Sequence, residues 1–168
     1  MKTLLLLRHA KSSWDNPSLG DFERPLAPRG EKDAPRIGKA LRDSGCVPDL
    51  VLSSPAVRAR TTAGIVLEAA RYKGPVRFDK RIYEASEDEL MEVLRSVDPA
   101  VETVMLVGHN PGFEMLAGEL IGSSGASASV RVPTAALLRL ELSAGGWGDV
   151  RSGCGALLWL VVPRCLSR

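Results

Sequence analysis

Four consecutive leucines end on an arginine and a histidine in the stretch LLLLRHAKSSW, residues 4–14. A continuous apolar run, as opposed to an alternating one, is typical of a strand covered on both faces in a parallel sheet. The same pattern recurs at residues 50–52 and 104–107. We therefore expect Arg8 and His9 at the carboxyl end of a buried strand, which is where open α/β sheets place their ligands.

The composition is that of an ordinary globular domain. The chain has 168 residues, 45% of them hydrophobic and 25% charged, so we expect one domain over residues 1–168. The formal charge of +2, from 22 basic and 20 acidic residues, favours neither a nucleic-acid nor a membrane-surface partner. The apolar run before Arg8 is too short for a signal peptide or a membrane span. We expect a cytoplasmic protein that is a monomer.

The three cysteines show no C-x-x-C spacing. An odd number without that spacing predicts neither a disulfide framework nor a zinc ribbon. We expect Cys46, Cys154 and Cys165 to be small, partly buried apolar residues.

Amphipathic segments lie between the apolar runs, with apolar residues at the i, i+3, i+4, i+7 spacing of a helix. They cover residues 63–70, 90–97 and 113–121, and a further helix is expected over 28–43. Helix starts are also indicated by sequence. Ser54-Pro55 and Asn110-Pro111 each place a capping residue before a proline at the first helical position, and Ser86 with Glu89 predicts a capping box. Strands that alternate with helices predict an α/β domain.

The pattern changes after residue 134. Two apolar segments, Ala135–Leu142 and Ala156–Val162, are separated by glycines and predict later strands, one of them antiparallel. Before them, Gly122–Ser129 (GSSGASAS) has the composition of a flexible loop. Whether the part of that loop near Ser123 covers a pocket stays open.

The only two histidines of the chain, His9 and His109, both follow a predicted buried strand. His109 comes after the run VMLVG. Taken alone, a histidine at a strand end is most often an ordinary surface or core residue. Two histidines at equivalent strand ends are harder to ascribe to coincidence, and they predict a shared site.

Arg58 adds positive charge to this predicted site. It lies in the first turn of the helix expected after Ser54-Pro55, and the free N–H groups of a helix start bind anions. A solvated surface arginine is the ordinary alternative. Arg60 faces a different direction on the same helix and is expected at the surface. Two arginines, two histidines and two helix starts directed at one point would suit a phosphoryl group.

Three motifs resemble those of the histidine phosphatase superfamily, also called phosphoglycerate mutase-like: LRHAKSS, SSPAVRARTTA and VGHNPGF. The compact size and the stretch DFERPLAPRG are most similar to the SixA-type phosphohistidine phosphatases. The similarity runs in order from about residue 1 to residue 122 and more weakly to the C-terminus. It implies a three-layer α/β/α sandwich with a mostly parallel mixed sheet.

The resemblance also implies roles for individual residues. His9 would be the nucleophile that becomes phosphorylated, Arg8, Arg58 and His109 would hold the phosphoryl oxygens, and Ser12 would donate to phosphate. An imidazole attacks phosphorus only when neutral, and neighbouring arginines would lower its pKa and keep it so. These charged and donor groups would take the place of magnesium, so no metal or cofactor is expected. Ala10, where the family usually has glycine, implies slight crowding without loss of activity.

The general acid is less clear. Glu84 is the candidate by its order along the chain, and the alternative is an ordinary carboxylate ahead of a helix. Without Glu84 in the pocket, the enzyme would suit phosphohistidine or phosphoramidate, whose leaving nitrogen is easily protonated. Arg24 and Arg29 would recruit an anionic substrate or serve a turn stiffened by prolines.

The leading hypothesis is a metal-independent phosphatase that works through a phosphohistidine intermediate and, as the resemblance to the SixA type implies, acts on protein phosphohistidine. Its alternatives are a phosphatase of a small phosphate ester or nucleotide, and a non-catalytic phosphate-binding or phosphoprotein-binding module. A mutase and a zinc protein are weaker alternatives, because the chain is short and its two histidines come without paired cysteines.

Overall fold

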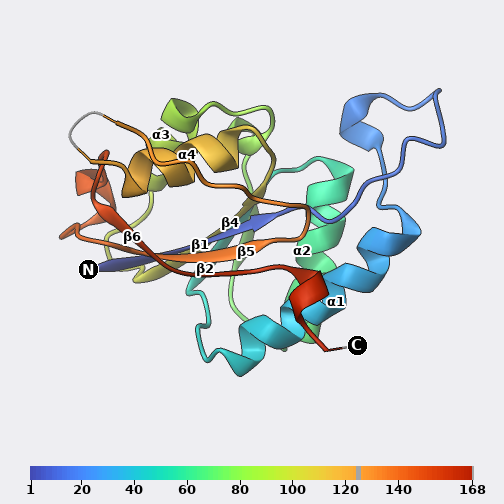
Figure 1. Cartoon of the computed structure of the whole chain (residues 1–168), viewed down its shortest axis with the longest axis horizontal. Helices are drawn as coiled ribbons and strands as arrows, with labels where there is room; N and C mark the ends of the chain where they lie inside the picture. Colours follow the sequence, from blue (N-terminus) through green and yellow to red (C-terminus); the bar gives the residue numbers. More distant parts are fainter. Residues whose placement is uncertain (124–125, 168) are drawn as a thin grey trace.

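The computed structural model describes residues 1–123 and 126–167. The described residues form one six-stranded sheet with helices on both faces (Figure 1). The strands are β1 (Lys2–Arg8), β2 (Leu50–Ser53), β3 (Val76–Phe78), β4 (Thr103–Gly108), β5 (Leu137–Leu142) and β6 (Gly155–Val161). The α-helices are α1 (Pro28–Asp43), α2 (Val57–Ala69), α3 (Glu87–Arg95) and α4 (Gly112–Ile121).

The strand order is β3-β2-β4-β1-β5-β6. Only β5 among these strands runs against the others, since it pairs antiparallel with both β1 and β6 while the remaining pairs are parallel. The prediction of a mostly parallel mixed sheet with one antiparallel strand is confirmed. The short edge strand β3 was not predicted, because three exposed residues are too few to show a periodicity.

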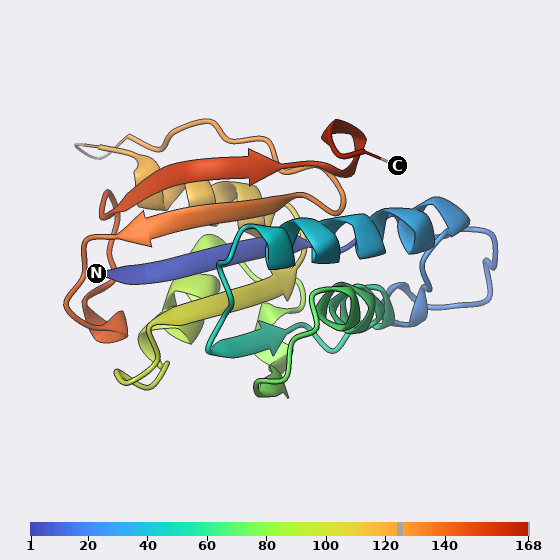
Figure 2. The same ribbon diagram turned by 90° about the horizontal axis from the view of Figure 1, so that it is seen from below.

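The leucines of β1 divide the core into two layers. Leu5 and Leu7 pack with the buried residues of α1 and α2, whereas Leu4 and Leu6 pack with those of α3 and α4. This follows from the strand period of two, which points successive side chains to opposite faces. Figures 1 and 2 show the two helix pairs on opposite sides of the sheet. The predicted three-layer α/β/α sandwich is confirmed.

Helix α1 has the predicted bounds, and Ser86 with Glu89 forms the predicted capping box of α3. Two predicted starts were wrong. Helix α2 begins at Val57 instead of Pro55, and α4 begins at Gly112 instead of Pro111, both without a side-chain cap. The reason is that the expected caps bond elsewhere. Ser54 Oγ lies 2.7 Å from His109 Nε2, and Asn110 Nδ2 donates to Val132 O.

The predicted C-terminal strands are both present, and β6 lies one residue earlier than predicted, with the same length. Strand β5 begins at Leu137, two residues late, because Ala135 has a left-handed φ of 60° that a strand does not accommodate. Residues 122, 123 and 126–129 lie outside helices and named strands, as predicted, and residues 124 and 125 of that loop lie outside the described residues.

The cysteine prediction was wrong in part. Cys154 is buried and Cys46 is half-buried, but Cys165 is exposed. It lies in a short 3-10 turn after the last strand, whereas Cys154 and Cys46 pack in the two layers of the core. No helix of the described residues has both the length and the apolar composition to cross a membrane.

Candidate active site

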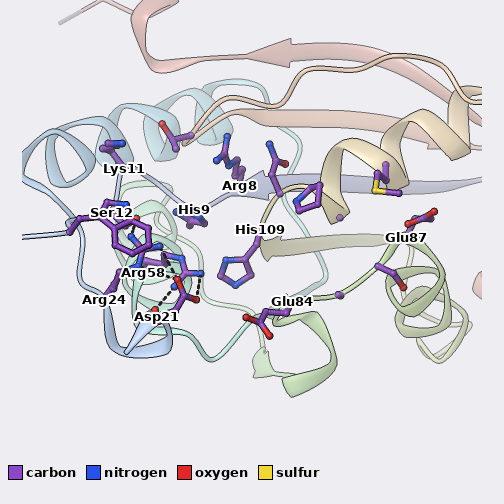
Figure 3. A pocket seen from close by; sticks show the side chains of 18 residues that line it. Arg8, His9, Lys11, Ser12, Asp21, Arg24, Arg58, Glu84, Glu87 and His109 are labelled. Carbon is purple, nitrogen blue, oxygen red and sulfur yellow. Dashed lines mark hydrogen bonds and ion pairs between the residues drawn. The ribbon is translucent and has the colours of Figure 1, made fainter. Parts of the chain in front are cut away.

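The parallel pairing of β1 with β4 brings the two histidines together. Arg8 and Gly108 are register partners, and His9 N donates to Gly108 O at 3.0 Å. The strands therefore end level, and the residues that follow leave the sheet side by side. The ring centroids of His9 and His109 lie 5.2 Å apart (Figure 3).

A cavity of about 680 Å³ opens above these strand ends. The first turn of α2, the start of α4 and residues from the 11–24 and 84–87 segments complete its wall. The lining includes every residue to which the sequence analysis gave a catalytic or phosphate-binding role: Arg8, His9, Ser12, Arg58, Glu84 and His109. The described residues of the 122–129 loop are not among those that line it.

His9 is 7% exposed, and its Nδ1 lies 2.8 Å from the carbonyl oxygen of Ala10. Because a carbonyl only accepts, Nδ1 carries the proton and Nε2 keeps a free lone pair. The pKa of His9 is lowered to about 4, first by burial and then by the charges of Arg58 and Arg8. The predicted lowering of the His9 pKa is confirmed, but burial contributes more to it than the arginines do. His9 is therefore neutral at pH 7.

His109 is 8% exposed, and its Nε2 lies 2.7 Å from Ser54 Oγ. Its Nδ1 is buried without a hydrogen-bond partner among the described residues. The pKa of His109 is lowered to about 3, first by burial and then by His9 and Arg58. The preceding Gly108 has to lack a side chain, since a Cβ there would lie 2.8 Å from the Phe113 ring.

The two arginines are held in different ways. Arg8 Nη1 donates to Val132 O at 2.9 Å, and burial lowers the pKa of this guanidinium below its ordinary value. Arg58 is 6% exposed and donates twice to Asp21, to the backbone oxygen at 2.7 Å and to Oδ2 at 3.0 Å. Both stay charged, because arginine is not deprotonated in proteins.

Asp21 joins several parts of the pocket, and sequence reasoning missed it. Its carboxylate accepts from Arg58, from Arg24 Nε at 3.1 Å and from the Tyr83 hydroxyl at 2.7 Å. Burial alone would raise the pKa of Asp21, but these hydrogen bonds outweigh it and lower the pKa to about 2. The only signal in the sequence was an acidic residue in the stretch DFERP, in a region without periodicity.

Ser12, Arg24 and Arg29 differ in their relation to the pocket. Ser12 Oγ accepts from Arg24 Nη1 at 2.8 Å, and both residues are buried and line the cavity. Arg24 thus lies in the pocket wall, where it also braces the 12–24 segment. Arg29 is exposed, lies 3.5 Å from Asp33 and does not line the pocket.

Glu84 lines the cavity, so it is not merely a carboxylate ahead of α3. It is exposed and has a left-handed φ of 54°. Its carboxylate is therefore available at the rim of the pocket (Figure 3).

The hydroxyl of Thr62 connects the segment that follows His9 with the first turn of α2, which carries Arg58. It accepts from Ala10 N at 2.9 Å and donates to Arg58 O at 2.7 Å. The backbone after His9 and the first turn of α2 are thereby joined through one atom. Ala10 itself is fully buried in the core layer that contains α1 and α2. Arg60, two residues beyond Arg58, is exposed as predicted.

The arrangement suits the binding of an oxyanion beside a neutral imidazole. Three guanidinium groups, those of Arg8, Arg24 and Arg58, border one cavity together with two neutral imidazoles and the start of α4. Helix starts and arginines both favour anions. Within residues 1–123 and 126–167, no three His, Cys, Asp or Glu side chains are placed to hold a metal ion.

The sequence of this chain is similar to a known family and to known proteins. The sequence profile of the histidine phosphatase superfamily (branch 1) matches residues 4–95. An uncharacterised protein of Mycobacterium tuberculosis is 38% identical over 94% of this chain and 100% of its own length. A chloroplastic protein of Arabidopsis thaliana is 37% identical over 82% of this chain and 66% of its own length.

Solved structures of other proteins are similar to this chain in fold. A candidate phosphohistidine phosphatase SixA from Agrobacterium tumefaciens superimposes with a TM-score of 0.80 at 29% identity, over 96% of this chain and 98% of that one. The protein histidine phosphatase SixA in complex with tungstate shares the fold, with a TM-score of 0.83 at 20% identity over 98% of this chain and 99% of that one. The chain therefore belongs to the histidine phosphatase superfamily, as a phosphatase of the SixA type.

Proposed function

We propose that this phosphatase removes the phosphoryl group from protein phosphohistidine through a phosphorylated His9. The observation that carries the proposal is the convergence of the His9 and His109 rings, 5.2 Å apart, with two arginines on one cavity. The likeness to the Agrobacterium tumefaciens SixA structure supports the choice of substrate. That the protein acts as a cytoplasmic monomer stays a prediction from the sequence.

In the first step the lone pair of His9 Nε2 forms a bond to phosphorus. The P–N bond of the substrate breaks, and its electron pair stays on the substrate imidazole, which takes up one proton. The His9 ring then carries a positive charge. The Nδ1–H donated to Ala10 O, at 2.8 Å, would stabilise that charge.

Arg8, Arg58 and His109 would stabilise the charge on the equatorial phosphoryl oxygens. An arginine in such a position contributes on the order of 10³ to 10⁵ in rate, or roughly 4 to 7 kcal/mol. The burial of Arg58 and His109 strengthens these interactions, because a drier site screens charge less.

In the second step a water oxygen bonds to phosphorus and the P–N bond to His9 breaks. The electron pair returns to Nε2, and phosphate leaves. The proton given up by the water balances the one taken up in the first step. Glu84, which lines the cavity and lies at its exposed rim, is our candidate to receive it.

A phosphatase of small phosphate esters or nucleotides is the second candidate. Glu84 favours it, because a carboxyl group at the pocket could protonate an alkoxide leaving group. Phosphohistidine needs no such acid, since its leaving nitrogen is easily protonated. A need for Glu84 as an acid in the first step, beside its role as a base in the second, would therefore separate the two substrate classes. A module that only binds phosphate is disfavoured by the complete set of Arg8, His9, Arg58 and His109.

The test compares release of phosphate from a phosphohistidine peptide, a phosphoserine peptide and a sugar phosphate, each with and without a chelator. We expect the phosphohistidine peptide to be the best substrate, chelator to change little and a labelled phosphoenzyme to be trapped in acid-free denaturant. Faster turnover of the sugar phosphate would favour the second candidate. A strict need for metal would overturn the role given to the arginines.

A further inference from the structure

A tryptophan is exposed at the proposed catalytic pocket. Trp14 lines the cavity and is 70% exposed. By contrast, Trp147 is fully buried and Trp159 is half-buried outside the cavity. A large aromatic side chain left in solvent exposes apolar area that binding of a ligand could cover. The roles proposed above do not use this side chain.

The indole of Trp14 is held in position. The guanidinium carbon of Arg24 lies 3.6 Å from the centre of the ring, within the range of a cation–π contact. Arg24 is 7% exposed and is itself fixed by its bonds to Asp21 and Ser12. One face of the indole thus rests on a braced cation, and the high exposure of the residue leaves the rest of the ring surface free.

Met115, from the first turns of α4, also lines this cavity and is 46% exposed. A thioether adapts its shape and makes favourable contacts with aromatic rings. The cavity therefore has cationic and imidazole groups for the phosphoryl group, and apolar surface from two further elements. When the phosphoryl group lies at His9, the rest of the substrate, from which that group is cleaved, would contact this apolar surface.

We propose that Trp14, braced by Arg24, is a subsite for the leaving group and selects substrates in which phosphate is attached to a planar aromatic ring. The imidazole of phosphohistidine belongs to this class, whereas the aliphatic carbon chains of phosphoserine and sugar phosphates do not. The inference rests on the proposed function, because it takes the phosphoryl group to lie at His9. It adds the chemical class of the other half of the substrate.

The test measures binding of phosphonates, which are not hydrolysed. Phenylphosphonate, cyclohexylphosphonate and methylphosphonate present the same anion on an aromatic, a saturated and a minimal group. We expect the intact protein to bind phenylphosphonate about three- to tenfold more tightly than cyclohexylphosphonate, which is the range of aromatic pair contacts beyond area burial. Trp14→Ala should lose this preference, and Trp14→Phe should restore most of it.

Leu19→Ala is the matched control, because Leu19 is an exposed apolar residue of the same segment that does not line the cavity. It should keep the preference. Equal affinities for the phenyl and cyclohexyl compounds, or a preference that survives Trp14→Ala, would overturn the subsite. The binding readout is independent of turnover, so a protein that hydrolyses no phosphohistidine but prefers phenylphosphonate would contradict the proposed function alone.

Discussion

The pocket has two halves that are built differently. The strand-end half consists of Arg8, His9 and His109, which follow or end paired strands. The loop half consists of Trp14, Asp21, Arg24 and Glu84, from irregular segments. The two histidines are 7% and 8% exposed, whereas Trp14 is 70% exposed and the Asp21 side chain 40%. Such a division would let the fold fix the proposed phosphoryl chemistry, while the loops would set which substrate is accepted.

The largest effect is expected in the strand-end half. His9→Ala should abolish turnover of every substrate, because the proposed nucleophile is lost, and no labelled phosphoenzyme should form. Release of phosphate from an aryl phosphate and from a phosphohistidine peptide measures this. If the variant keeps full activity on either compound, the assignment of His9 is wrong and the division between the halves fails with it.

The same half should dominate the response of stability to acid. His9 and His109 have pKa values lowered to about 4 and about 3, against about 6.5 in an unfolded chain. Unfolding at pH 5 should therefore take up nearly two protons, so stability is complete above about pH 6.5 and falls as the pH is lowered. Between pH 7.5 and pH 5 the two histidines should together cost about 4 kcal/mol.

Urea unfolding at a series of pH values measures that slope. His9→Asn should remove about half of it, since one of the two titrating groups is gone. A stability that does not change between pH 7.5 and pH 5 would contradict the buried, neutral state of both rings.

Arg58 lies between the two halves, since it borders the proposed phosphoryl site and is held by Asp21 of the loop half. Arg58→Ala should lower kcat/KM at least a hundredfold by removing a charge that stabilises the transition state, or about 2.7 kcal/mol. Arg60→Ala on the same helix is the control, because Arg60 is exposed, and it should stay within about twofold as surface changes usually do. Equal losses in the two variants would mean a general effect of charge.

The smallest effect is expected at the contact between Asp21 and Arg58, where the two halves meet. The Asp21 carboxylate competes with phosphate for Arg58, so Asp21→Asn should tighten inhibition by inorganic phosphate about three- to tenfold, a modest change because Asp21 is partly exposed. Inhibition constants for phosphate measure this. Asp33→Asn, which alters a carboxylate paired with Arg36 away from the cavity, should change nothing. Weaker phosphate binding in Asp21→Asn would show that the carboxylate holds Arg58 in place for the substrate.

Sequence reasoning succeeded in the strand-end half for a physical reason. Buried parallel strands give continuous apolar runs, and level strand ends bring the residues that follow them together, so His9 and His109 could be related without knowledge of the loops. The loop half could not be predicted, because Asp21 is placed by contacts with residues 37 and 62 positions further along the chain. The start of α2 was misplaced for a related reason, since Ser54 bonds His109 instead of capping the helix.

The hydroxyl of Thr62 has a consequence for how this protein can change. Because it accepts from one backbone segment and donates to another, only a residue with a hydroxyl can serve both, and valine, of similar shape, would leave two buried polar groups unmatched. Laboratory evolution toward new substrates should therefore accumulate replacements at the exposed positions of the 11–24 and 84–87 segments, and return threonine or serine at position 62 in every active lineage.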